Sequence, residues 1–166
     1  RYFADIRSIE ELREAVDFAR QRKLKIFVLG GGSNVLLPDK GINKLVIKIG
    51  IKGITFQNKK EHRNDEFVLV SAGAGEAWDQ VVARAVGKNL SGLENLSLIP
   101  GTVGGAVYQN IGAYGAELKS VIDSVDVFDT KTRKLKTLSR NDCRLDYRTS
   151  LFQRPAGQKY VIVHAV

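Results

Sequence analysis

The first periodic segment of the chain predicts a helix over residues 9–22. Its apolar residues recur at the spacing of one helical face: Ile9, Leu12, Ala15, Val16 and Ala19. Ser8 precedes this face and Glu11 lies three residues after Ser8, which is the pattern of a capping box at a helix N-terminus. We therefore expect the helix to begin directly after Ser8.

Short apolar or alternating segments elsewhere predict strands. They cover residues 25–29, 44–49, 51–56, 66–70, 121–128, 134–138 and 159–166. The segment 25–29 is read as a buried strand. Residues 76–88 have helical periodicity with Trp78 on the apolar face, so we expect Trp78 in the core rather than on a stacking platform. Two short helices are also expected, one beginning at Pro100 and one at 139–142.

The stretch 98–118 combines several glycines with apolar residues and a single charge. A flexible linker would be polar and rich in serine. Glycine has no Cβ and tolerates positive φ, so this backbone is suited to approach another backbone segment or a ligand closely while it stays packed. Taken alone, the stretch fits a tight crossing in the core as well as it fits the wall of a ligand site. A second glycine cluster at 30–34 favours two walls around one large ligand.

The cluster at 30–34 follows a predicted strand, which raises the question of a dinucleotide fold. A Rossmann fingerprint requires G-x-G-x-x-G opening a helix, but here an apolar segment reaches Pro38 too soon. The Walker pattern fails as well, because no Gly-Lys-Ser/Thr follows. The remaining interpretations are a tight strand–strand turn and a nest of backbone N–H groups that faces an anion, with Ser33 and Asn34 as additional donors.

Composition and charge narrow the possible classes. The chain has 166 residues, one cysteine and no apolar run near the ~20 residues that span a bilayer. The single cysteine fits a reducing compartment, so we expect a cytoplasmic protein without membrane insertion, and the absence of methionine leads us to expect a piece of a longer protein. The net charge of +8 allows a nucleic-acid surface, an anionic small-molecule site or a solvated face. The basic run at 58–63 lacks aromatic residues for base stacking, so we interpret it as a solvated loop.

Few side chains suggest chemistry of their own. His62 lies in the basic loop and His164 in an apolar strand, a pairing too dissimilar for a metal site. Cys143 is followed by Arg144, a neighbour that can lower a thiol pKa, but a lone cysteine without an accompanying base is expected to be inert. Arg148 lies in a mixed segment and is suited to clamp a carboxylate or to stabilise developing negative charge.

Four segments together resemble one enzyme family, the bacterial UDP-N-acetylenolpyruvoylglucosamine reductases. Residues 30–36 resemble the loop that holds the flavin pyrophosphate, and residues 92–104 resemble the second wall of the flavin site. Residues 109–115 carry the Gln-Asn-Ile form of that wall, which indicates the type I branch. Residues 143–152 resemble the catalytic arginine segment, with Leu-Asp in place of a commoner Phe-Gly and Thr149 in place of an acid.

The resemblance implies an α+β fold. It is the two-lobed FAD-binding domain of the vanillyl-alcohol-oxidase type, also called the PCMH type, and not a Rossmann fold. Residues 1–50 would form a small βαβ lobe and residues 51–166 a larger mixed lobe, with FAD between them. The family's C-terminal substrate-binding domain, which carries the proton-donor serine and an assisting glutamate, is expected to lie outside this chain, as is an N-terminal Asn-Thr-Phe segment. We therefore expect little or no turnover from these residues alone.

The implied activity belongs to peptidoglycan biosynthesis, and hence to cell-wall biogenesis, cell shape and cell division. NADPH would reduce FAD, and the reduced flavin would convert UDP-N-acetylglucosamine enolpyruvate to UDP-N-acetylmuramate. Arg148 would be catalytic and would bind substrate, with Tyr114 near the substrate. The implied cofactor-binding residues are Gly30, Gly31, Gly32, Ser33, Asn34, Val35 and Leu36 in the first cluster, and Pro100, Gly101, Thr102, Gly104, Gly105, Asn110, Gly112, Ala113 and Ile162 beyond it.

Two alternatives stay open beside this family. Another flavin oxidase of the same fold would often tether FAD through histidine or cysteine, and neither glycine cluster contains such a residue. A nucleic-acid binder is suggested by the charge alone, and its binding would fall steeply with salt.

Overall fold

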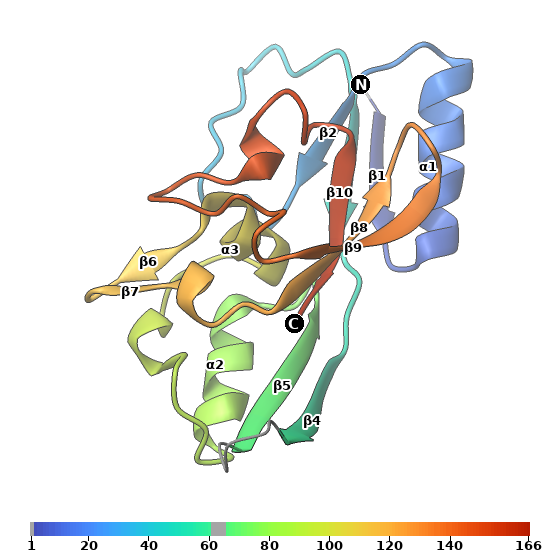
Figure 1. Cartoon of the computed structure of the whole chain (residues 1–166). Helices are drawn as coiled ribbons and strands as arrows, with labels where there is room; N and C mark the ends of the chain where they lie inside the picture. Colours follow the sequence, from blue (N-terminus) through green and yellow to red (C-terminus); the bar gives the residue numbers. More distant parts are fainter. Residues whose placement is uncertain (1, 61–65) are drawn as a thin grey trace.

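Two β-sheets, one parallel and one antiparallel, form the framework of the molecule (Figure 1). The computed structural model describes residues 2–60 and 66–166. The parallel sheet has the strand order β1-β3-β2 and consists of β1 (Tyr2–Ile6), β2 (Ile26–Leu29) and β3 (Leu45–Ile49). Helix α1 (Ile9–Gln21) connects β1 to β2 and packs beside this sheet (Figure 1).

Helix α1 begins where the sequence predicts. The Ser8 hydroxyl accepts a hydrogen bond from the Glu11 N–H at 3.1 Å. The Glu11 carboxylate reaches back to the N–H of Arg7, at 2.6 Å, rather than to that of Ser8. Leu12 and Val16 are buried on the inner face, as is Ile47 of β3. The N-cap at Ser8 and the apolar face of this helix are thus confirmed, whereas the reciprocal bond of a capping box is replaced by the bond to Arg7.

The larger sheet has the order β4-β5-β10-β8-β9, and each neighbouring pair is antiparallel. Its strands are β4 (Ile54–Lys60), β5 (Glu66–Gly73), β8 (Ser124–Asp129), β9 (Lys134–Ser139) and β10 (Tyr160–Ala165). Figure 1 shows α2 (Trp78–Val86) and α3 (Val103–Gln109) on one side of this sheet. The smaller elements are η1 (Glu94–Leu96), η2 (Leu118–Ser120), η3 (Leu151–Gln153), β6 (Gly112–Ala113) and β7 (Ala116–Glu117).

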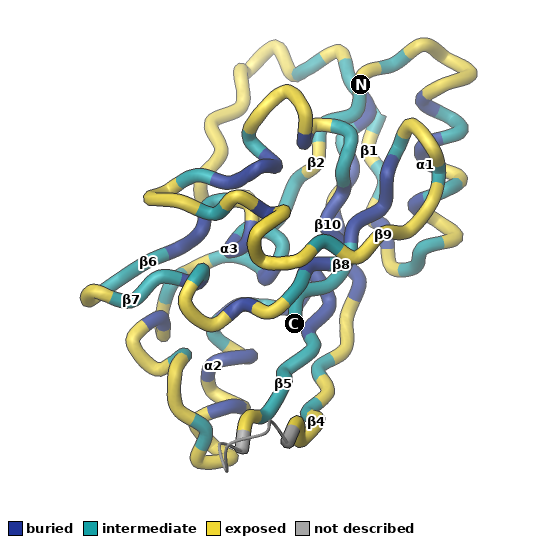
Figure 2. The backbone as a smooth tube through the Cα atoms, in the orientation of Figure 1, coloured by how far each residue is buried: buried dark blue, intermediate teal, exposed yellow. Residues whose placement is uncertain are grey.

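The core lies between the helices and the central strands of both sheets, where the backbone in Figure 2 is coloured as buried. Val127 of β8, Val163 of β10 and Val107 of α3 are essentially inaccessible. Trp78 is also buried, and its indole N–H donates to the Leu96 carbonyl at 2.7 Å. The prediction that Trp78 belongs to the core is therefore confirmed.

Several local predictions were wrong for reasons of tertiary structure. The strand at 26–29 lies at the edge of the parallel sheet, so Val28 is 42% exposed instead of buried. Strand β1 was not predicted, because its pairing partner, β3, lies some forty residues away along the chain. The short helix expected at 139–142 is instead a turn, in which Asp142 accepts hydrogen bonds from the N–H and hydroxyl of Ser139.

The turn between β5 and α2 ties the parallel sheet to the larger one. A Cβ on Gly75 would lie 2.6 Å from the Gly50 carbonyl carbon, so only glycine fits this crossing. The Glu76 carboxylate accepts the Gly53 N–H at 2.7 Å. That hydrogen bond, supported by the Lys52 ammonium, lowers the pKa of Glu76. The same turn accepts the Gly104 N–H through the Ala74 carbonyl and so also fixes the start of α3.

A second set of contacts joins α1 to the turn between β8 and β9. The Arg20 guanidinium donates to the carbonyls of Thr130 and Lys131, at 2.9 and 2.6 Å. Arg13 donates to the Arg133 carbonyl at 2.9 Å, and Arg133 itself forms an ion pair with Asp17. The two sheets are therefore held together on two sides.

Candidate functional site

The two glycine clusters lie directly against each other, although they are far apart in the sequence. A Cβ on Gly31 would lie 3.1 Å from the Gly101 Cα, and one on Gly30 would lie 3.0 Å from the Thr102 Oγ1. The Ser33 hydroxyl donates to the Pro100 carbonyl, 67 residues further along the chain, at 3.5 Å. The structure therefore brings the end of β2 and the segment before α3 together into one site.

The first cluster has the properties of an anion nest. Within the part of the chain that the structure describes, the backbone N–H groups of residues 31–34 make no hydrogen bond. Gly32 has φ +78°, which turns the backbone at the centre of the cluster. All four residues are exposed, as are Val35 and Leu36, the latter almost completely. A row of unpaired N–H groups at a turn is suited to bind phosphate.

The start of α3 differs from the prediction. The helix begins at Val103 with Thr102 as the N-cap residue, and not at Pro100. Its first N–H groups already have partners, because Val103 donates to the Glu76 carbonyl and Gly104 to the Ala74 carbonyl, each at 2.9 Å. The helix terminus therefore offers no free donors from these residues. The N–H groups of Gly101 and Thr102, which precede the helix, have no hydrogen-bond partner within residues 2–60 and 66–166.

Gly104 and Gly105 differ in the space around them. A Cβ on Gly104 would lie 3.1 Å from the Cβ of Ala74, so close helix packing accounts for this glycine. A Cβ on Gly105 would meet only the Thr102 hydroxyl, at 3.7 Å. Packing thus explains one glycine of the pair, and Gly105 lies on the side of Thr102 that faces Gly30.

Asn110 ends α3 in the left-handed conformation, with φ +44°, and is 1% exposed. Its amide donates to the Glu117 carboxylate and to the Asp146 carbonyl, each at 2.8 Å. Its Oδ1 accepts the Lys119 N–H at 2.9 Å. Both amide hydrogens are therefore used inside the protein, where they fix the end of α3 to Glu117 and Asp146.

The second wall continues in the hairpin of β6 and β7, which contains Gly112 and Ala113. Its two-residue turn has Tyr114 at φ +51° and Gly115 at φ +80°, as a type I′ turn requires. Tyr114 is 90% exposed at the tip. This aromatic side chain is therefore presented to whatever lies against the wall.

Arg148 lies beside this hairpin. It occupies a tight turn between Asp146 and Thr149, which exchange backbone hydrogen bonds of 3.0 Å in both directions. Its backbone is left-handed, with φ +53°, and its guanidinium donates to the Gly112 carbonyl at 3.0 Å. The catalytic candidate and the second wall are thus in direct contact, and the rest of the guanidinium lies exposed.

Other candidates contribute less to the site. Cys143 is fully buried, and burial raises the pKa of its thiol to about 11, which agrees with an inert cysteine and leaves no lowering of the pKa by Arg144. Ile162 is 7% exposed in β10, against which α3 packs, and so lies in the core beneath the second wall. His62 and part of the basic run lie outside the described residues. No three His, Cys, Asp or Glu side chains gather into a metal site within the described ranges.

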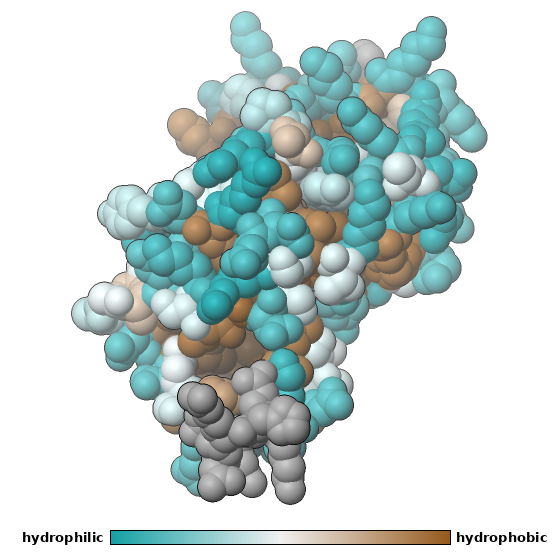
Figure 3. Space-filling view, viewed as in Figure 1, coloured by the Kyte–Doolittle hydropathy of each residue, from teal (hydrophilic) through white to brown (hydrophobic). Residues whose placement is uncertain are grey.

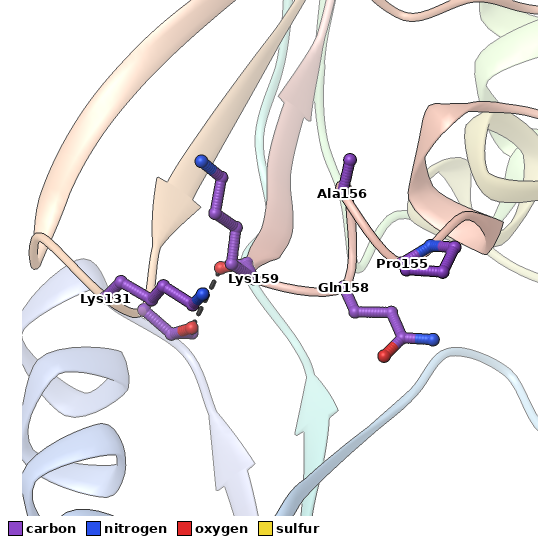
Figure 4. Close-up of a pocket in the computed structure, with 6 residues that line it drawn as sticks. Lys131, Pro155, Ala156, Gln158 and Lys159 are labelled. Atoms are coloured by element: carbon purple, nitrogen blue, oxygen red, sulfur yellow. Dashed lines mark hydrogen bonds between the residues drawn. The ribbon is translucent and has the colours of Figure 1, made fainter.

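Two hollows lie apart from the glycine clusters. One, of about 450 Å³, is shown in Figure 4 and is lined by Thr130, Lys131, Pro155, Ala156, Gln158 and Lys159. The other, of about 310 Å³, is lined by Tyr2, Phe3, Leu37, Gly41, Ile42 and Val46. No residue of 30–34 or 100–105 lines either hollow. Figure 3 shows apolar patches exposed between hydrophilic side chains on one face of the molecule.

The fold and the site together define a class. A parallel β-α-β unit, an antiparallel sheet with helices on one side, and a nest of N–H groups where the two meet are the architecture of an FAD-binding domain unlike the Rossmann fold. The sequence matches the FAD binding domain family over residues 1–138, and the chain belongs to this family. Among helices within the described residues, none is long and apolar enough to cross a membrane.

Relatives and solved structures agree with this assignment. The UDP-N-acetylenolpyruvoylglucosamine reductase of Neisseria gonorrhoeae is 46% identical over the whole chain, which covers 46% of that protein. The reductase of the same name from Pseudomonas aeruginosa is 46% identical over 93% of the chain, which covers 44% of its length. The chain thus spans about half the length of the curated relatives it matches.

In three dimensions the chain is similar to the UDP-N-acetylenolpyruvylglucosamine reductase of Thermus caldophilus, with a TM-score of 0.74 and 27% identity. That match covers 98% of this chain and 53% of the other. A VAO-type flavoprotein from Myceliophthora thermophila matches with a TM-score of 0.69 at 13% identity, over 98% of this chain and 30% of the flavoprotein chain. This likeness shows that the two share a fold. The fold class expected from the sequence is therefore confirmed.

Proposed function

We propose that this chain is the FAD-binding part of an NADPH-dependent reductase that converts UDP-N-acetylglucosamine enolpyruvate to UDP-N-acetylmuramate in the cytoplasm. The names of its relatives in Neisseria and Pseudomonas support this reaction. The observation that carries the placement of the cofactor is the contact between the two glycine clusters, with unpaired N–H groups on both sides. The partners are accordingly small molecules, FAD, NADPH and a nucleotide sugar, and not a nucleic acid.

FAD lies, in this proposal, between a small lobe of residues 1–50 and a larger lobe of residues 51–166. Residues 30–36 hold the pyrophosphate, for which the free N–H groups of 31–34 are fitted. The segment from Pro100 to Thr102 and the Gly112–Ala113 strand line the dinucleotide and the ring. Gly104, Asn110 and Ile162 support this wall from within, because each is packed or hydrogen-bonded on its inner side.

Arg148 is the residue of this chain that acts on the substrate. FAD, when bound, supplies the hydride that it receives from NADPH. Addition of hydride to the enolpyruvyl group places negative charge toward the substrate carboxylate, and a guanidinium stabilises that charge. The Gly112 carbonyl occupies one of the five N–H donors of Arg148 and fixes its direction, and the other four have no partner among the described residues and can bind a carboxylate. Tyr114 contacts the same substrate from the hairpin tip. The proton donor belongs to the half of the relatives that this chain does not span.

The test is an anaerobic half-reaction assay on the native full-length protein with FAD bound. NADPH bleaches the flavin absorbance, and UDP-N-acetylglucosamine enolpyruvate restores it with formation of UDP-N-acetylmuramate. A flavin that NADPH reduces but that this substrate leaves reduced would refute the proposed reaction while leaving FAD binding intact.

A further inference from the structure

Two side chains beyond the arginine turn converge on the end of α3. The Ser150 hydroxyl, which is fully buried, donates to the Tyr108 carbonyl at 2.6 Å. The Gln153 amide donates to the same carbonyl at 2.9 Å. Tyr108 lies in the last turn of α3, where the backbone carbonyl groups have no N–H donor within the helix. Ser150 and Gln153 therefore supply the missing donors at this end of the helix.

The Gln153 amide also makes a contact that Ser150 does not. Its second hydrogen bond goes to the carbonyl of Arg148 itself, at 3.1 Å. One amide group thus joins the backbone of the catalytic candidate to α3, the helix within the second wall. Arg148 needs such support, because its left-handed φ of +53° is unfavourable for a residue with a side chain.

Two further contacts fix the same turn to the same wall. The Asn110 amide donates to the Asp146 carbonyl on one side of Arg148. The Arg148 guanidinium donates to the Gly112 carbonyl on the other. Gln153 is the only one of these groups that holds the Arg148 backbone while remaining outside the wall. Its loss would loosen the Arg148 backbone without removing a group that faces the ligand, while the Asp146–Thr149 and Asn110–Asp146 hydrogen bonds remain.

We propose that Gln153 is a positioning residue for the reaction. It holds the Arg148 backbone in the left-handed turn and so keeps the guanidinium at the distance from the second wall that the substrate carboxylate requires. The inference rests on the proposed function, because it assigns Arg148 to that substrate. Gln153 acts on the step that uses Arg148, the transfer to the enolpyruvyl group, and not on the reduction of the flavin by NADPH.

The experiment compares Gln153→Glu with the native full-length protein in the two anaerobic half-reactions. This substitution keeps the side-chain size but replaces the donor amide with an acceptor facing two carbonyls. We expect flavin reduction by NADPH within twofold of the native rate. At saturating substrate, we expect reoxidation by UDP-N-acetylglucosamine enolpyruvate to be about 10- to 100-fold slower, as a misplaced group costs about that much. Lowering the pH toward 5 protonates the glutamate, restores one donor and recovers part of the loss.

The control is Gln158→Ala, which removes an exposed glutamine from the same loop and leaves both half-reactions unchanged. If Gln153→Glu does not retain FAD, Gln153→Asn serves instead, because its shorter amide reaches one carbonyl at most and should slow reoxidation alone. Reoxidation within twofold of native in a variant that holds FAD overturns the inference. Failure of the native protein to be reoxidised by this substrate overturns the proposed function instead.

Discussion

Asp129 offers a quantitative test of the electrostatics at the end of β8. Its carboxylate is fully buried and accepts the N–H groups of Lys131 and Thr132, at 2.9 and 3.1 Å. It also pairs with the ammonium of Lys136 at 3.0 Å. Burial raises the pKa of Asp129, but these hydrogen bonds and charges outweigh burial and hold the pKa at about 2, below an ordinary 3.8.

The sign and size of the effect follow from linkage. A pKa that is lower in the folded state stabilises the protein above pH 3.8, and the stabilisation is lost as pH falls toward 2. At about 1.4 kcal/mol per pH unit, the lowered pKa corresponds to about 2.5 kcal/mol at pH 7. At pH 3, where the unfolded carboxyl is mostly protonated, about 1.3 kcal/mol remains.

We therefore predict that Asp129→Asn lowers the free energy of unfolding by about 2.5 kcal/mol at pH 7 and by about half as much at pH 3. Urea unfolding at both pH values, with equal m-values, measures the difference. Asp126→Asn is the matched control, because Asp126 lies in the same strand at a partly exposed position and its carboxylate accepts only the Thr137 hydroxyl among the described residues. The same loss at both pH values would refute the reasoning, since a packing defect does not titrate.

The remaining predictions concern the turn at Gly75, the cap of α1 and the catalytic candidate. Gly75→Ala places a Cβ 2.6 Å from the Gly50 backbone, so we expect the free energy of unfolding in urea to fall by about 1–3 kcal/mol or more. A stability equal to native would contradict the close contact between Gly75 and Gly50. Ser8→Ala removes the acceptor for Glu11 N–H and should cost about 1 kcal/mol, whereas Ser8→Asp should restore the helix cap and most of that stability. Arg148→Ala should slow reoxidation of the reduced flavin by substrate about 10²- to 10³-fold in stopped-flow measurements while FAD binding persists, and loss of FAD would assign Arg148 to the cofactor instead.

Local patterns in the sequence were enough for the elements whose signals are local. The cap at Ser8 and the apolar face of α1 depend on residues within one or two turns of each other, and both were predicted. The prediction for Trp78 was correct because the apolar residues of its segment recur at the spacing of one helical face. The exclusion of a Rossmann fold likewise needed only the residues that follow the first glycine cluster.

Features that depend on distant partners were not visible in the sequence. The start of α3 was misplaced because carbonyls of Ala74 and Glu76 occupy its first N–H groups. The hydrogen bonds of the Asn110 amide to Glu117 and Asp146 were not foreseen, because both partners lie outside its local sequence. Gln153 was missed entirely, since nothing in its local sequence indicates that it bonds the carbonyls of Tyr108 and Arg148. Such groups would be found only by accounting for the backbone partners at each helix end.

The most direct test of the account is an FAD titration of the purified chain, followed by flavin fluorescence and by thermal unfolding. If the two glycine clusters form the cofactor site, FAD binds one-to-one and stabilises the fold, by about 2.7 kcal/mol at a hundredfold excess over Kd. Gly31→Val, whose side chain would enter the space against Gly101, abolishes binding, while Gly87→Ala at the end of α2 binds as native. A cooperative melt that FAD leaves unchanged, or native affinity in Gly31→Val, would contradict the placement of FAD between the two clusters.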